Sequence, residues 1–407
     1  MLWMFFFTTS YSLLRLLLVK RWDEGLILLA CITWSMNAQF VNQTALYILQ
    51  VTLGCIMLAR TVTVKKKSKN TQPTLLIFFL AIYSLVNSFI NEVSITGFAR
   101  ITLIAILAFY FNRLNYDVTN RALKYVITAQ TLMCMSVFAN RIPRKNIGID
   151  PISGLQTYPN LVGHPNYLAY MAAFNAILFL ILYSRKQIWK TSGFILNLLC
   201  IIYAQSRSAL IATLLSFAYL FLASIRKSYT KLNEIQPKSN FIVLVSIMVV
   251  GVYSSSLASE RFIQFIQSGG FTGANSFGWR LLQWNTAIEV LKENLIFGVG
   301  WQNSQNFLLG GLKAHNSFIQ VALELGFIGL ALYLLIFYRF TVSLLRASNG
   351  LPFFLILMIA SVVDAGLFYP SIAINLLLVT KFLCSNQPIG ISSNSLTYRK
   401  NAHPKPH

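Results

Sequence analysis

The sequence predicts an all-α polytopic membrane protein with roughly twelve transmembrane helices and a large ordered outer loop. Apolar residues make up 56% of the 407 positions, without counting glycine, and charged residues only 11%. A soluble domain has about 45–50% apolar residues with glycine included and about 25% charged residues. The 33 basic residues, against 11 acidic ones, lie mostly in short clusters between alternate apolar runs. The positive-inside rule explains this pattern, and a nucleic-acid binder is not expected.

The apolar runs define the elements in chain order. The first 24 residues are expected to form an N-terminal segment lying partly in the membrane interface, because Arg15 interrupts the run 1–19 and no basic region precedes it, unlike a cleaved signal peptide. Transmembrane helices are predicted where runs approach about 20 residues, at 25–39, 42–59, 74–93, 98–112, 122–138, 167–184, 192–205, 207–224, 240–257, 316–338, 351–367 and 371–383.

This division gives nine spans within 25–257, an outer loop over 258–315, three spans within 316–384 and a cytoplasmic tail over 385–407. The loop is rich in aromatic residues, as an ordered subdomain would be. Apolar residues recur in it at intervals of three or four, which predicts an amphipathic helix over 279–294, from Leu281, Trp284, Ile288, Leu291 and Leu295. Ser276 is expected to cap this helix, and Gly298 and Gly300 to end it.

Two histidines lie outside the tail, and both fall on the predicted outer side. His164 precedes Pro165 and Asn166, and His315 precedes Asn316 at the start of a span. Imidazole is the side chain that most often serves as a general base in catalysis. A histidine that merely caps a membrane helix is the structural alternative for His315.

Asn316, Gln320 and Glu324 form a polar stripe at intervals of four that descends into an apolar span. A carboxylate such as Glu324 is costly in a membrane unless it is paired or faces a polar cavity. Structural support is favoured over catalysis for Glu324. The nearby Gly326 and Gly329 indicate close helix packing.

Three arginines on the outer side are not explained by the positive-inside rule. Arg280 begins the predicted loop helix, Arg207 lies between two apolar runs, and Arg100 lies near the outer end of its span. Helix N-termini and bidentate arginines both bind phosphate, so these residues suit a diphosphate at the membrane surface. Snorkelling at the interface is the alternative for Arg280.

The sequence contains no Walker A motif, no HExxH motif and no paired acidic metal motif. It therefore predicts neither a cofactor nor a metal site.

Four motifs in this order resemble those of the O-antigen ligase family. They are the run 163–169 around His164, the run 206–209 around Arg207, Arg280 with Trp284, and Gly298–Trp301 followed by the pattern from His315 to Gly329. The resemblance extends over about 160–335, and the first 140 residues match only in being hydrophobic.

The resemblance implies a membrane bundle with a large periplasmic loop, in the bacterial inner (plasma) membrane. It also implies a metal-independent, inverting transfer of a glycan from an undecaprenyl diphosphate-linked donor to a glycan or lipid A core acceptor. Arg207 and Arg280 would bind the diphosphate, and His315 would accept the proton of the acceptor hydroxyl.

Several functions stay open at this point. Within the family, ligase, polymerase and protein O-oligosaccharyltransferase are not separated by any motif, although a length near 400 residues favours the first two. A solute transporter is a second class, for which Glu324 and Asp364 are the candidate residues. A structural scaffold of a polysaccharide assembly complex is a third.

Overall fold

The structure, a computed structural model, describes residues 9–16, 19, 21–36, 43–63, 72–93, 96–139, 148–149, 156–157, 165–183, 186–204, 206–230, 276–311, 313–363 and 370–385. Residues 9–16 are helical. The further helices are α2 (Trp22–Ser35), α3 (Gln43–Thr63), α4 (Gln72–Ile90), α5 (Thr96–Arg113), α6 (Tyr116–Cys134), α7 (Ser136–Ala139), α8 (Pro165–Leu182), α9 (Gln187–Tyr203), α10 (Arg207–Thr230), α12 (Ser276–Glu293), α13 (Ser317–Arg346), α14 (Leu351–Val363) and α15 (Pro370–Ser385), with 3-10 turns η1 (Ser304–Asn306) and η2 (Leu309–Gly311).

The helical fold class is confirmed, and each predicted span within the described residues coincides with a helix. The predicted span at 240–257 lies outside those residues. An unpredicted element is a small antiparallel pair, β1 (Gly148–Ile149) with β2 (Gln156–Thr157). Two-residue strands are too short to leave a readable alternation in the sequence.

Within the described part of the chain, three helices are both long and apolar enough to cross a membrane, namely 44–63, 207–224 and 317–346. Shorter apolar helices accompany them at 74–90, 166–182, 351–363 and 372–385. Large apolar side chains such as Val62 and Phe89 are exposed on the outside of the bundle, as lipid-facing residues would be. The chain is a helical membrane protein, and the arrangement of twelve spans stays a prediction.

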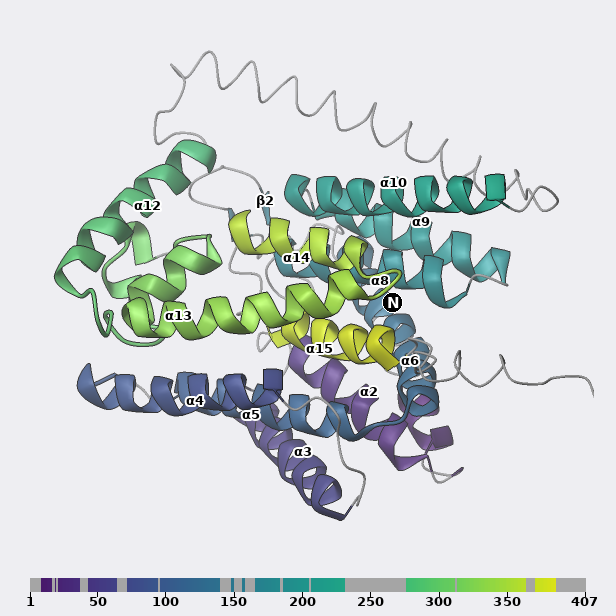
Figure 1. The fold of residues 1–407 in the computed structure, drawn as a ribbon, viewed down its shortest axis with the longest axis horizontal. Helices are drawn as coiled ribbons and strands as arrows, with labels where there is room; N and C mark the ends of the chain where they lie inside the picture. Colours follow the sequence, from purple (N-terminus) through teal and green to yellow (C-terminus); the bar gives the residue numbers. More distant parts are fainter. Residues whose placement is uncertain are drawn as a thin grey trace, which may run out of the picture.

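Helix α8 lies at the centre of the bundle. It packs against α6, α9, α10, α14 and α15, and its apolar side chains from Leu168 to Phe179 are buried. A helix that is apolar on all faces either faces lipid or is buried among other helices, and the contacts of α8 with its neighbours show that it is buried. Figure 1 shows α9 and α10 on one side of the bundle, α4 and α5 on the other, and α12 at one end.

Two acidic residues at the start of α2 tie neighbouring helices together. Glu24, only 3% exposed, accepts a hydrogen bond from Arg121 at 2.9 Å, and Asp23 pairs with Arg60 at 3.2 Å. Glu24 is a buried carboxylate, so removing Arg121 would leave an uncompensated charge.

Candidate functional site

Helix α12 confirms the predicted helix of the outer loop, with three corrections. Its predicted apolar face is not the buried one, because Ile288 and Leu295 are exposed whereas Gln283 and Ala287 are buried. The helix begins at Ser276, so this residue is the first of the helix and not its cap, and Arg280 is its fifth residue. The helix ends at Glu293, before the two glycines that were expected to end it. Gly298 and Gly300 instead bring the chain against α13. The helix-dipole argument for Arg280 is weaker than the sequence suggested, because the effect is confined to the first turn.

His315 has an unusual backbone conformation. Its φ is +50°, in the left-handed region that non-glycine residues rarely occupy outside functional or strongly constrained sites. The next residue, Asn316, is the N-cap of α13, and its side-chain oxygen accepts hydrogen bonds from the backbone N–H groups of Phe318 and Ile319 at 3.0 and 3.1 Å. This satisfies two of the N–H groups that a helix start leaves without partners.

The residue before His315 is fixed from two sides. The indole Nε1 of Trp284 donates to the Ala314 carbonyl at 2.7 Å, and the Ala314 N–H donates to Gln320 Oε1 at 2.8 Å. Ala314 is fully buried. Both peptide groups of Ala314 are therefore held in place, one by α12 and one by α13, so the strained backbone of His315 is supported on its N-terminal side.

Gln320 is itself oriented by a buried polar network. Its Nε2 donates to Ser304 Oγ and to Glu324 Oε1, and Ser304 Oγ donates to the same carboxylate oxygen at 2.6 Å. All three side chains are at most 4% exposed. A buried carboxylate accepting two hydrogen bonds fixes which end of the Gln320 amide faces Ala314. The predicted polar stripe is confirmed, and Glu324 accepts hydrogen bonds from its own helix and from η1.

Helix α13 is interrupted two residues after Glu324. Gly326 has φ +64° and ψ −168°, which is not helical. The preceding loop supplies hydrogen bonds across the interruption: Val299 N–H donates to Leu323 O at 2.9 Å and Gly300 N–H to Glu324 O at 3.0 Å. In the other direction, Phe327 N–H donates to Leu295 O at 2.9 Å.

Two glycines make this close backbone contact possible. A Cβ on Gly326 would lie 2.1 Å from the carbonyl oxygen of Ile296, and one on Gly298 would lie 2.6 Å from the carbonyl carbon of Glu324. Gly326 was expected to serve close packing between helices. Its actual neighbour is the backbone of the loop, and its positive φ is the second reason for glycine.

Helix α4 braces the loop from its other side. Tyr83 Oη donates to Leu325 O at 2.9 Å. Asn87 uses both ends of its amide: Nδ2 donates to Phe297 O, and Oδ1 accepts from Trp301 N–H at 3.1 Å. Tyr83 and Asn87 were not among the predicted site residues, because they lie far away in the sequence, in a span that reads as apolar.

Arg207 is the first residue of α10, and its side chain is exposed. Ser216 Oγ on α10 donates to Pro352 O on α14 at 2.8 Å. The two helices run in opposite directions. Arg207 precedes Ser216 by the same number of residues as Ser361 follows Pro352. Arg207 is therefore level with the last turn of α14.

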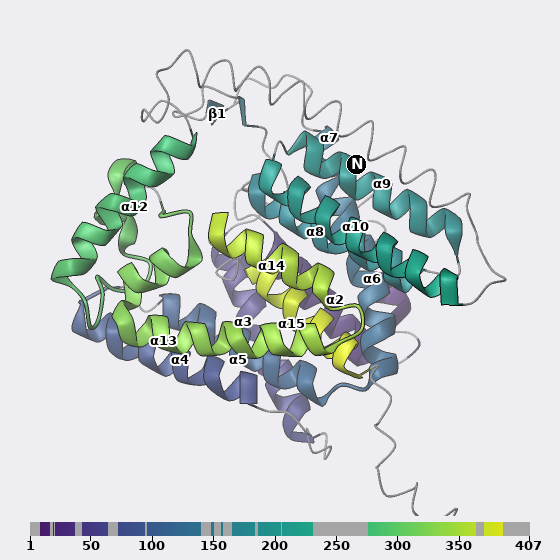
Figure 2. The ribbon, with the colours of Figure 1, turned by 45° about the horizontal axis from the view of Figure 1, so that its top comes forward.

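The start of α13 reaches the same turn of α14, because Asn316 Nδ2 donates to Val362 O at 3.0 Å. Arg280 lies one turn before Trp284, which bonds Ala314. In both views the N-terminal ends of α10 and α12 lie on the side of the C-terminal end of α14 (Figures 1 and 2). The backbone segments of Arg207, Arg280 and His315 therefore lie toward the same end of the bundle, where α12 packs against α13 and α10 against α14.

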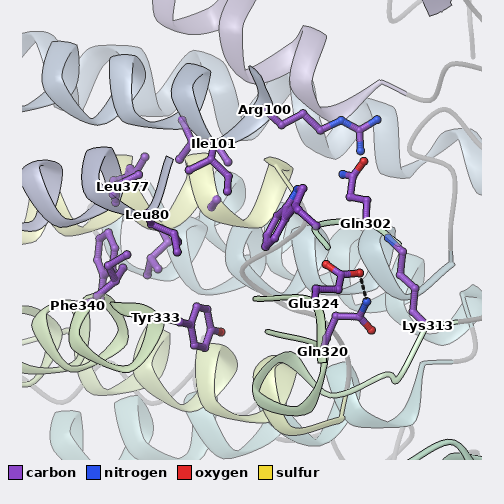
Figure 3. Close-up of a pocket in the computed structure, with 16 residues that line it drawn as sticks. Leu80, Arg100, Ile101, Gln302, Lys313, Gln320, Glu324, Tyr333, Phe340 and Leu377 are labelled. Carbon is purple, nitrogen blue, oxygen red and sulfur yellow. Dashed lines mark hydrogen bonds between the residues drawn. The ribbon is translucent and has the colours of Figure 1, made fainter. Parts of the chain in front are cut away.

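Arg100 lies elsewhere. It donates to Tyr47 Oη, with its guanidinium 5.7 Å from the centroid of that ring. It also lines a cavity with Gln302, Lys313, Gln320 and Glu324 (Figure 3). Arg207, Arg280 and His315 do not line this cavity.

The remaining predicted residues are His164 and Asn166. His164 lies outside the described residues. Asn166 is half-buried at the start of α8, whose first turns reach α10 through a hydrogen bond of 2.8 Å from Tyr170 Oη to Ser208 Oγ. Lys313 and Ser304 were not predicted as site residues. The sequence could have indicated them, because both are polar and lie near the His315 motif within the outer loop.

Comparison with known proteins agrees with the motifs. A search among proteins of curated function finds no match to this chain. The model of one protein family matches a segment that runs from α9 to the middle of α13 and contains Arg207, Arg280, His315, Glu324 and Gly326. That family is O-antigen ligase, and the match covers residues 192–334 of this chain.

Proposed function

We propose that this protein transfers a glycan from an undecaprenyl diphosphate-linked donor to an acceptor hydroxyl at the outer face of the bacterial inner membrane. The family match supports glycan transfer in surface polysaccharide synthesis as the general activity. The choice of His315 as the reacting residue rests on its backbone conformation. Its φ of +50° is strained, and the hydrogen bonds of Ala314 and Asn316 hold it in place.

In the proposed reaction, His315 accepts the proton of the acceptor hydroxyl while its oxygen attacks the anomeric carbon of the donor sugar. The new bond is the glycosidic C–O bond, and the bond that breaks joins the anomeric carbon to the diphosphate oxygen. The lipid diphosphate leaves with the electron pair. Attack opposite the leaving group inverts the anomeric centre.

Arg207 and Arg280 would bind the diphosphate. Negative charge grows on this group as the bond breaks, so fixed guanidinium groups stabilise the transition state more than the bound donor. In this proposal the two arginines supply the positive charge that a metal ion supplies in other transferases. Arg207 begins α10, and Arg280 lies in α12 one turn before Trp284, which bonds the residue before His315; both positions support this role.

The acceptor separates two versions of the activity. A ligase transfers the glycan to lipid A core, and a polymerase transfers it to a growing glycan; we favour the ligase. A deletion strain tests the proposal, because loss of the polymer-capped core indicates a ligase and accumulation of a one-repeat product indicates a polymerase. Complementation with His315→Ala should not restore the glycan, whereas Gln305→Ala, at an exposed position of η1, should. Unchanged surface glycans in the deletion strain would refute the proposal.

A solute transporter is the second candidate, favoured by one observation. Glu324 is a buried carboxylate that lines a cavity and lies two residues before the interruption of α13, and interrupted helices with ionisable groups are typical of transporter binding sites. Uptake that depends on Glu324 but not on Arg207, Arg280 or His315 would support the transporter.

A further inference from the structure

Three consecutive apolar residues follow the end of α12 and are exposed. Leu295, Ile296 and Phe297 have 44%, 59% and 39% of their surface accessible. Phe327, whose N–H donates to the Leu295 carbonyl at 2.9 Å, is itself 53% exposed. Large apolar side chains that are exposed together mark a contact with a membrane or with another protein.

Helix α4 fixes the depth of this segment. The Tyr83 hydroxyl donates to Leu325 O at 2.9 Å and lies 3.5 Å from Ile296 O. Tyr83 is in the middle of α4, and at 1.5 Å per residue it lies about 16 Å from the first residue of the helix and about 10 Å from the last. A helix of this length nearly crosses the hydrocarbon core of a bilayer, which is about 30 Å thick. The backbone of Ile296 is therefore level with the interior of a predicted span and not with its end.

The charged residues on the two helices give the same depth. Along α13, the first charged residue after Gly326 is Arg339, which is about 20 Å further along the helix. Along α4, the first charged residue after Tyr83 is Glu92, just beyond the helix end that is about 10 Å from Tyr83. The two distances add to about 30 Å, the thickness of the hydrocarbon core, and charged side chains are expected at its edges. The bend at Gly326 therefore lies about 10 Å inside the edge that is nearer to α12.

The backbone of residues 294–300 is hydrogen-bonded within the protein. Gly298 N–H donates to Asn294 O at 2.8 Å. Val299 O accepts from Asn303 Nδ2 at 2.8 Å, and Gly300 O accepts from Asn303 N–H at 3.1 Å. The N–H groups of Val299 and Gly300 donate to α13, as described above. Non-helical backbone is tolerated inside a membrane only where protein groups replace water in this way.

We propose that residues 295–300 form a re-entrant segment within the bilayer, in the leaflet on the side of α12, where Leu295, Ile296 and Phe297 contact lipid acyl chains. The exposed apolar faces of the two neighbouring helices continue this surface, with Val86 on α4 and Ile328 on α13. In both views the C-terminal end of α12 lies near α4 and the bend of α13 (Figures 1 and 2).

This arrangement moves the membrane boundary. The sequence places residues 295–300 in the loop outside the membrane, whereas here the part of the loop that carries His315 begins inside the bilayer. The lipid contact holds this part of the loop at its start, and α13 holds it at its end.

A spin label at residue 296 tests the depth of the segment. Cys55 and Cys384 are exposed, whereas the other three cysteines are buried, so Cys55→Ala/Cys384→Ala protein is the background for Ile296→Cys. The labelled protein is reconstituted in nanodiscs of phosphatidylcholine and phosphatidylglycerol. Val86→Cys, on the lipid-facing surface of α4, and Gln305→Cys, at an exposed position of η1, are the references.

The readout is the ratio of the collision rates of the label with oxygen and with a water-soluble nickel chelate. We expect this ratio to be about tenfold higher at residue 296 than at residue 305, and similar at residues 296 and 86, because hydrocarbon excludes the polar chelate. Equal ratios at 296 and 305 would place the segment in water. Exclusion of both reagents at 296 would mean that another protein or a second copy of the chain covers it. Either result overturns the proposal.

A second measurement keeps all the native cysteines. Ile296→Asp puts a carboxylate among acyl chains and should lower the Tm in nanodiscs by about 5 °C. Ile296→Ala removes the side chain without adding a charge and should lower the Tm less. Gln305→Asp is the matched control and should leave it unchanged. A wild-type Tm for Ile296→Asp, or equal Tm values for the aspartate and alanine variants, would contradict the lipid contact.

Discussion

Gln320 accepts a hydrogen bond from the backbone N–H of Ala314 at 2.8 Å, and so links the interior of α13 to the residue that precedes His315. The bond depends on the orientation of the Gln320 amide, which Glu324 and Ser304 fix through its other end. A residue inside the membrane helix therefore determines the backbone of the loop that carries the proposed base. Because misplacement of a reacting group by about 1 Å can reduce a rate by a factor of about 100, this support is expected to matter for catalysis.

Gln320→Met tests this support. Methionine fills a similar volume but cannot accept the Ala314 N–H, which is left unsatisfied in a buried position at a cost of about 1–3 kcal/mol. We expect kcat for glycan transfer to fall at least tenfold with a smaller change in the KM for the donor. Phe327→Leu, at an exposed position of the same helix, is the control. A Gln320→Met enzyme with unchanged kcat would show that the Ala314 contact does not position His315.

Glu324 is predicted to act as a hydrogen-bond acceptor for Ser304 and Gln320. Glu324→Gln keeps an oxygen that can accept from both partners, so it should retain most of the transfer activity, whereas Glu324→Leu should lose it together with thermal stability. Both variants are compared by kcat and by Tm in detergent. Equal loss of activity in the two variants, with Tm unchanged in Glu324→Gln, would indicate that the charge itself takes part in the reaction.

Gly326→Ala should disrupt the interruption of α13. The added Cβ would lie 2.1 Å from Ile296 O at a residue with φ +64°, and we expect a loss of about 2 kcal/mol or more in the free energy of unfolding. The matched control is Gly25→Ala in α2, where the nearest atom would be Leu13 Cδ1 at 3.6 Å and alanine has the higher helix propensity. Similar Tm values for the two variants would contradict the contact with the loop.

Asn87 is predicted to order the loop between α12 and η1. Asn87→Ala removes the acceptor of Trp301 N–H and the donor to Phe297 O, so the loop should exchange its amide hydrogens faster around 297–301. Asn91→Ala is the control, because Asn91 Nδ2 donates to the backbone carbonyl of Asn87, one turn before it, at 3.1 Å. Unchanged hydrogen exchange in Asn87→Ala would rule out this role.

The sequence predicted the helices well, because a run of apolar residues can satisfy its backbone within a membrane only as a helix. It also predicted α12 from the spacing of Leu281, Trp284 and Ile288, and the polar stripe from Gln320 to Glu324. These features are local. The start of α12 was predicted three residues too late, and its earlier start at Ser276 moves Arg280 out of the first turn.

The interruption at Gly326 could not be predicted, because its cause lies outside α13. A glycine in an apolar run fits close helix packing equally well, and only the loop from Leu295 to Gly300 makes the non-helical conformation favourable. Asn87 was missed for the same reason: its partners are more than 200 residues away. The cavity with Arg100 and Lys313 depends on four helices together, and no single segment contains its pattern.

The most direct test of the account is glycan transfer by the purified protein from a synthetic undecaprenyl diphosphate-linked oligosaccharide to an isolated lipid A core acceptor. Wild-type protein should form the glycosylated product and release undecaprenyl diphosphate. His315→Ala, Arg207→Ala and Arg280→Ala should each reduce turnover at least a hundredfold at unchanged Tm, and lysine at either arginine should restore it only in part, because the bidentate contact is lost. Wild-type turnover by His315→Ala would contradict the account.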